Sequence, residues 1–64
     1  MKEDDVKVIT RAYDGTLETL YKVFFSEFTM AHGDADTEQA AKERFRKGLL
    51  HARHVQELAL DLVP

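Results

Sequence analysis

The chain has 64 residues, no cysteine, one proline and a formal net charge of −3. The lack of cysteine excludes disulfide bonds, and the mixture of charges excludes a general attraction to nucleic acid or to anionic membranes. A domain of about 60 residues buries only about 60% of its unfolded surface, so we expect this chain to gain stability by association with further chains.

The first predicted element is a helix over about residues 3–31. Residues 6–10 are rich in β-branched side chains and an Asp-Gly-Thr sequence follows them, so a strand and a turn are an alternative here. The single long helix is favoured because the helical spacing continues through this segment, with Gly15 on the outer face. The recurring apolar positions are Val6, Ile9, Tyr13, Leu17, Leu20, Phe24, Phe28 and Ala31.

A loop is predicted over residues 32–36 and a second helix over about residues 37–63. Gly33 can take the left-handed conformation that ends a helix, and Asp36 fits an N-cap with Gln39 in the capping-box position. Because the connection is short, the two helices must be antiparallel. The residues expected on the packed face of the second helix are Ala41, Phe45, Gly48, Leu49, Ala52, Val55, Ala59 and Leu62.

These elements predict an all-α fold in which residues 1–64 form one domain, a two-helix antiparallel hairpin. Folding the chain at the loop brings Phe24 level with Phe45 and Leu20 level with Leu49. Large residues of the first helix then face small residues of the second. Gly48 is expected at a close contact, where it leaves room for an aromatic ring or for the facing backbone.

Apolar residues also occur outside the predicted contact, although two helices bury only one side of each other. Such an excess marks a surface for a partner. The simplest closure is a homodimer with two-fold symmetry, a four-helix bundle, or a higher even oligomer. The predicted dimer contacts are Tyr21, Phe25, Leu50 and Leu58.

Four residues on the second helix have spacings that suit a metal site. His51, His54, Glu57 and Asp61 follow one another at intervals of three, three and four, which can aim imidazole and carboxylate groups at one ion. They drift toward the outer face, however, so a solvent-exposed polar flank is the favoured interpretation. We expect no metal and no cofactor.

Glu27 lies close to the apolar face of the first helix, where a carboxylate needs a charged partner. The hairpin alignment puts Lys42 opposite Glu27, which predicts an ion pair near the loop. A general acid or base would also need a pocket and a second catalytic group. The sequence indicates neither, so we expect no enzymatic activity.

The middle of the second helix is basic. Such a patch can bind phosphates, and Tyr21 and Phe25 could stack against single-stranded bases, although dimer contacts are the favoured role for these two rings. The basic residues straddle the packed face, which favours an ordinary solvated helix surface. They are Lys42, Arg44, Arg46, Lys47 and Arg53.

The Asp34-Ala35-Asp36 loop between two helices of heptad-like spacing resembles the layout of the Rop family. Members of that family dimerise into four-helix bundles and bind paired RNA loops with the outer face of the first helix. The resemblance implies a bundle, but it identifies no RNA-binding residue in this chain. The matching face here is only partly basic and carries Lys7, Arg11, Glu18 and Lys22.

Two classes of function therefore remain. The favoured one is a small homo-oligomeric protein-interaction or regulatory module without catalytic activity, whose protein partner the sequence does not identify. The alternative is a small nucleic-acid-binding regulator that uses the basic middle of the second helix. It would be Rop-like, or ribbon-helix-helix-like if residues 6–10 paired as a strand across a dimer. The overall acidity favours the first class. The acidic start of the chain and the lack of a long apolar run predict a cytoplasmic protein without membrane contact.

Overall fold

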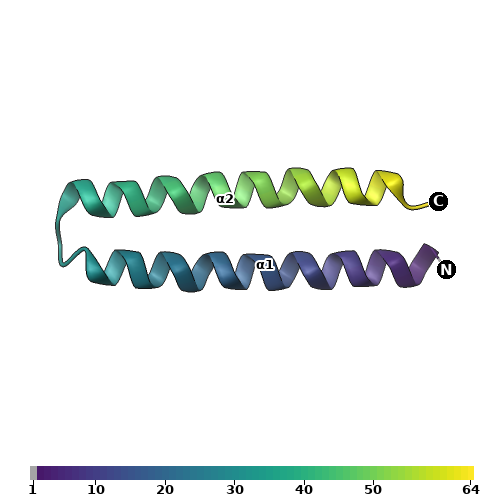
Figure 1. Cartoon of the computed structure of the whole chain (residues 1–64), viewed down its shortest axis with the longest axis horizontal. Coiled ribbons are helices and arrows are strands. Elements are labelled where there is room, and N and C mark those ends of the chain that lie inside the picture. Colours follow the sequence, from purple (N-terminus) through teal and green to yellow (C-terminus); the bar gives the residue numbers. More distant parts are fainter. Residues whose placement is uncertain (1) are drawn as a thin grey trace.

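The computed structural model describes residues 2–64, with side chains from Asp4 onward. Two α-helices of nearly equal length lie side by side in opposite directions, α1 over Lys2–Met30 and α2 over Ala35–Leu62 (Figure 1). The Cα framework measures 49 × 15 × 6 Å, so the protein is a single layer of two helices. Both ends of the chain lie at the same end of this layer. The predicted antiparallel hairpin is confirmed.

The first helix is continuous, so residues 6–10 are helical. The strand alternative for this segment is wrong, and the ribbon-helix-helix version of the nucleic-acid function falls with it. Val6, Ile9 and Tyr13 are half-buried in the hairpin, and this packing outweighs the weak β preference of the segment. Gly15 is exposed, and apart from its neighbours and the backbone of its own helix no atom lies within 4 Å of the position its Cβ would take, so its predicted place on the outer face is confirmed.

The loop turns through two residues in the left-handed conformation, His32 with φ 51° and Gly33 with φ 82°. Gly33 therefore has the predicted conformation, which glycine takes without a steric penalty. Backbone hydrogen bonds close the turn, from the Asp34 N–H to the Ala31 carbonyl at 3.0 Å and from the His32 N–H to the Thr29 carbonyl at 3.3 Å. As a result α2 begins at Ala35, earlier than the sequence predicts.

The N-cap of α2 is Asp34, so the prediction of Asp36 is wrong. The Asp34 carboxylate accepts hydrogen bonds from the Thr37 N–H, at 2.9 Å, and from the Thr37 hydroxyl. Asp36 lies in the first turn of the helix, and Gln39 donates to Glu43 at 3.3 Å instead of completing a capping box. Asp34 takes the cap because the residue three positions later supplies two donors to one carboxylate.

Aromatic and small residues make the contact between the helices. The Phe24 ring stacks on the Phe45 ring with a centroid distance of 4.8 Å and an interplanar angle of 19°, as the alignment predicts. At Gly48 an added Cβ would lie 2.7 Å from the Leu20 Cδ2 atom. The predicted close contact is thus confirmed, and the group that fills the space is the Leu20 side chain rather than an aromatic ring or the backbone.

The hairpin has almost no interior. Among the described side chains only Ala31 and Ala41 are buried, and no large side chain is fully buried. Even the residues of the contact, such as Leu20, Phe24 and Phe45, keep part of their surface exposed. Neither helix has the length of uncharged apolar sequence that a membrane crossing requires, as far as residues 2–64 are concerned.

Replacing Gly48 by Leu is expected to leave the protein about 1–3 kcal/mol less stable than replacing Gly15 by Leu. Both changes remove a helical glycine and gain similar helix propensity, so the difference between them reports the contact with Leu20. Thermal unfolding followed by circular dichroism at one protein concentration measures it. A Gly48→Leu variant that melted at or above the Gly15→Leu variant would contradict the close contact.

Asp34 is expected to make unfolding sensitive to acid. The hydrogen bonds from the Thr37 hydroxyl and the Thr37 N–H hold the pKa of Asp34 below its usual value of 3.8. A carboxylate whose pKa is lowered in the folded state stabilises the protein at pH values above the pKa that the group has in the unfolded chain. This stabilisation is lost as the pH falls through the pKa of the folded state. Asp34→Asn keeps a capping side chain that does not titrate, so its melting temperature should fall less steeply below pH 3.8.

Asp36→Asn is the matched control, because it removes the same charge two residues further along without touching the cap. It should keep the steep acid dependence of the parent. Identical acid profiles for the Asp34→Asn and Asp36→Asn variants would contradict the assignment of Asp34 as the cap.

Candidate interaction surfaces

A layer of two helices has two broad sides, and contacts between α1 and α2 show which residues share a side. On one side the Arg44 guanidinium bonds the Glu27 carboxylate, with 2.5 Å between Nη2 and Oε2. On the other side the Lys42 ammonium lies 5.8 Å from the centre of the Phe28 ring. These two contacts mark the two sides. A residue that is three, four, seven or eleven positions from one of these four residues lies on the same side of the helix as that residue.

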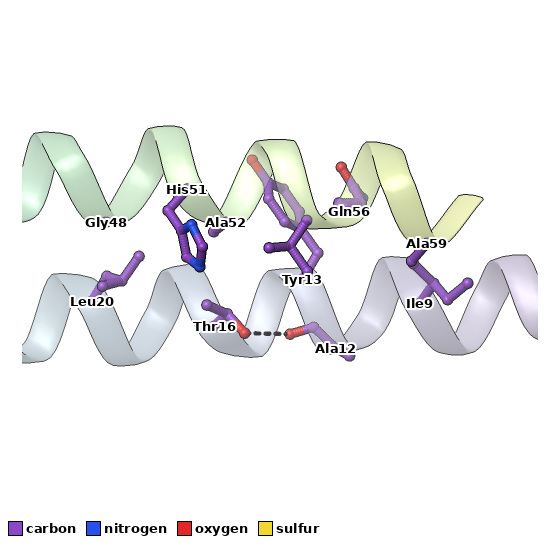
Figure 2. A pocket seen from close by; sticks show the side chains of 11 residues that line it. Ile9, Ala12, Tyr13, Thr16, Leu20, Gly48, His51, Ala52, Gln56 and Ala59 are labelled. Carbon is purple, nitrogen blue, oxygen red and sulfur yellow. Dashed lines mark hydrogen bonds between the residues drawn. The ribbon is translucent and has the colours of Figure 1, made fainter. Parts of the chain in front are cut away.

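A hollow of about 430 Å³ lies between the helices on the side of the Glu27–Arg44 pair. Small residues of α2, Gly48, Ala52 and Ala59, line it together with Ala12 and Thr16 of α1, so space remains that no side chain fills. We call it the groove, and the side that bears it the groove side. Its lining is Ile9, Ala12, Tyr13, Thr16 and Leu20 from α1, and Gly48, His51, Ala52, Val55, Gln56 and Ala59 from α2 (Figure 2).

Few polar groups enter the groove, and none of its lining residues is Asp, Glu, Lys or Arg. The Thr16 hydroxyl donates to the Ala12 carbonyl at 3.1 Å, so it is already satisfied within its own helix. The His51 ring points between the helices, and the Tyr13 ring extends from α1 toward α2 (Figure 2). The groove is therefore a mostly apolar surface, with the His51 imidazole, the Gln56 amide and the Tyr13 hydroxyl as its other polar groups.

The four residues of the predicted polar flank of α2, His51, His54, Glu57 and Asp61, are all exposed. His51 also lines the groove, whereas the other three do not. Within the part of the chain that the structure describes, no three His, Asp or Glu side chains come together in a way that could hold a metal ion. The sequence prediction missed the groove, although the small residues at 12, 48, 52 and 59 were a signal for it.

The groove side carries further exposed apolar residues toward both ends of the hairpin. Leu58 and Leu62 follow Val55 at intervals of three and seven along α2, while Val23 and Met30 follow Thr16 at intervals of seven and fourteen along α1. Their exposed fractions are 50% for Leu58, 83% for Leu62, 51% for Val23 and 74% for Met30. The apolar surface thus extends well beyond the groove.

The opposite side bears a pair of aromatic rings. Tyr21 and Phe25 are 56% and 59% exposed, their ring centroids are 6.3 Å apart, and they border a shallow hollow of about 330 Å³ with Lys22 and Ser26. Phe28 continues the same face of α1 three residues after Phe25, and Lys42 lies over it. We call this the aromatic side.

The five predicted patch residues are divided between the two sides. Arg46 and Arg53 follow Lys42 at intervals of four and eleven, so all three lie on the aromatic side. Arg44 pairs with Glu27 on the groove side, and Lys47 follows it at an interval of three. The predicted partner of Glu27, Lys42, is therefore wrong, because that lysine faces the opposite side of the hairpin.

The predicted dimer contacts are all exposed, at 56% for Tyr21, 59% for Phe25, 53% for Leu50 and 50% for Leu58. They do not share a side. Tyr21 and Phe25 lie on the aromatic side, Leu58 lies on the groove side, and Leu50 is about 200° around α2 from Gly48 and so faces outward. One flat contact with a second chain cannot include all four.

Comparison of this chain with protein-family models, with curated proteins and with solved structures finds no match. The likeness to the Rop hairpins therefore remains one of layout, and the surfaces themselves carry the functional argument.

Proposed function

We propose that this hairpin is half of a homodimeric four-helix bundle, in which a second copy covers the groove side, and that it works as a protein-interaction or regulatory module without catalytic activity. The observation that carries this proposal is the near absence of buried side chains, since from Asp4 to Pro64 only Ala31 and Ala41 are buried in the hairpin alone. Burying apolar surface is the main favourable term in folding. A second copy would supply the missing cover.

The dimensions of the layer suit such a dimer. A face of the 49 × 15 Å Cα framework offers roughly 700 Å² even without the width of its side chains, and a stable interface needs about 800 Å² from each partner. A contact between identical faces closes with two-fold symmetry and leaves no open surface for further growth.

Electrostatics favours the groove side as the covered face. Burying an unpaired charge is strongly unfavourable, and the groove has no charged residue in its lining. On this side Glu27 and Arg44 are joined by an ion pair, and the nearby cation Lys47 is exposed. The aromatic side, by contrast, carries the cations Lys42, Arg46 and Arg53, which form no ion pair within residues 4–64 and which a second copy on that side would have to cover.

Sedimentation or light scattering should give about twice the chain mass of 7.4 kDa at micromolar concentration. Val55→Glu, in the groove lining, should shift the protein toward the monomer, because a carboxylate would have to be buried without a partner. Leu50→Glu, outside the groove on the same helix, is the matched control and should leave the mass unchanged. A parent protein with the mass of one chain at every concentration would contradict the proposal.

His51 and His54 offer a second test of the covered face. His51→Leu replaces the imidazole of the groove by an apolar side chain. The added apolar burial should stabilise the dimer by about 1.4 kcal/mol, which lowers its dissociation constant roughly tenfold. His54→Leu makes the same chemical change three residues away, outside the groove, and should leave the dissociation constant unchanged. Sedimentation across a dilution series measures both. If His51→Leu weakened the dimer or left it unaltered, the second copy would not lie over the groove.

A further inference from the structure

Three cations and two exposed rings lie together on the aromatic side. Lys42, Arg46 and Arg53 follow one edge of α2 at a span of about 16 Å, and Tyr21 and Phe25 lie on α1 with their ring centroids 6.3 Å apart. The Phe24–Phe45 stack and the Lys42–Phe28 contact set which residues of the two helices are level, so Phe25 on α1 is level with the Lys42–Arg46 segment of α2. We call these five residues the aromatic–basic strip.

We propose that the aromatic–basic strip binds single-stranded nucleic acid, with the cations contacting phosphates and the two rings stacking against unpaired bases. Surfaces that bind single strands without sequence preference combine these two features, a positive track along the backbone and aromatic side chains on which bases stack. This inference goes beyond the proposed dimer and does not require it. The strip lies on the side away from the groove, so it would stay exposed in a dimer closed across the groove.

The charges of the strip are available for a ligand. Within residues 4–64 two ion pairs occur, Glu18 with Lys22 and Glu27 with Arg44, and neither involves Lys42, Arg46 or Arg53. The Lys22 ammonium is 3.0 Å from the Glu18 carboxylate, so these two charges largely offset each other beside Tyr21. The net charge of −3 does not prevent binding, because charges more than about 8 Å apart are screened at physiological salt.

The exposed rings favour a single strand over the other anionic macromolecules. In a duplex the bases are stacked on each other, so Tyr21 and Phe25 would have no ring to stack on unless a base were flipped out. An acidic amphipathic helix would instead seek an apolar groove for its own side chains, and that groove lies on the opposite side of this hairpin. A single strand is the ligand that uses both the cations and the rings.

The test is fluorescence anisotropy with labelled oligo(dT) and oligo(rU) of about ten nucleotides, measured over a range of salt concentrations. Three phosphate contacts predict a slope of about −2 for log affinity against log salt. Lys42→Ala, Arg46→Ala and Arg53→Ala should each reduce the size of this slope by about 0.7. Tyr21→Ala and Phe25→Ala should weaken binding by about five- to a hundredfold at constant slope.

Lys47→Ala is the matched control, since it removes a cation of α2 that faces the groove side, and it should leave affinity and slope unchanged. The inference would be overturned if the protein bound no oligonucleotide at low salt, or if Lys47→Ala lowered the affinity as much as the substitutions in the strip. It would also be overturned if a duplex of the same length, or polyglutamate, bound as tightly as the single-stranded oligonucleotides. Light scattering on the Tyr21→Ala and Phe25→Ala variants separates the two proposals. Conversion of these variants to monomers would identify the strip as the dimer contact and overturn its role in binding nucleic acid.

The two proposals fail separately. A parent protein that binds the oligonucleotides as a monomer would contradict the dimer and leave the strip supported. A stable dimer that binds neither oligonucleotide would overturn the strip and leave the dimer supported.

Discussion

In a layer of two helices each side chain can be shielded by one neighbouring helix at most, and the properties of this protein follow from that constraint. Residues that point straight at the neighbour reach only partial burial, as Phe24 and Phe45 do although their rings stack at 4.8 Å. Among the described side chains, burial is limited to two alanines in the half of the hairpin nearer the loop, Ala31 and Ala41. The rest of the apolar surface remains available for contact with another molecule.

Small residues shape that surface. Gly48 leaves room for the Leu20 side chain against the backbone of α2, and beyond that point, where alanines of both helices are among the lining residues, a hollow remains. A larger residue at position 52 or 59 would fill this space with a side chain of the same molecule. The groove thus results from small residues on both helices, and its mostly apolar lining favours contact with another apolar surface.

The rotation of each helix about its own axis separates the charges. Arg44 and Lys42 are two residues apart, about 200° around the helix, so one reaches Glu27 on the groove side and the other lies over Phe28 on the aromatic side. The same rotation divides the basic middle of α2 into two smaller groups. An apolar side suited to a second copy and a basic, aromatic side suited to an anion then coexist on a protein of 64 residues.

Features that depend on neighbours within about four residues could be predicted from the sequence: two helices, the left-handed turn at Gly33 and the antiparallel arrangement that a short loop requires. It also predicted the Phe24–Phe45 pairing, because the loop sets which residues are level with each other. The tertiary structure alone decided between chemically equivalent candidates. Arg44 rather than Lys42 paired with Glu27, and His51 rather than His54 entered the groove. These outcomes depend on how far each helix is rotated against the other, and one residue changes the direction of a side chain by about 100°, so spacing along the sequence cannot distinguish them.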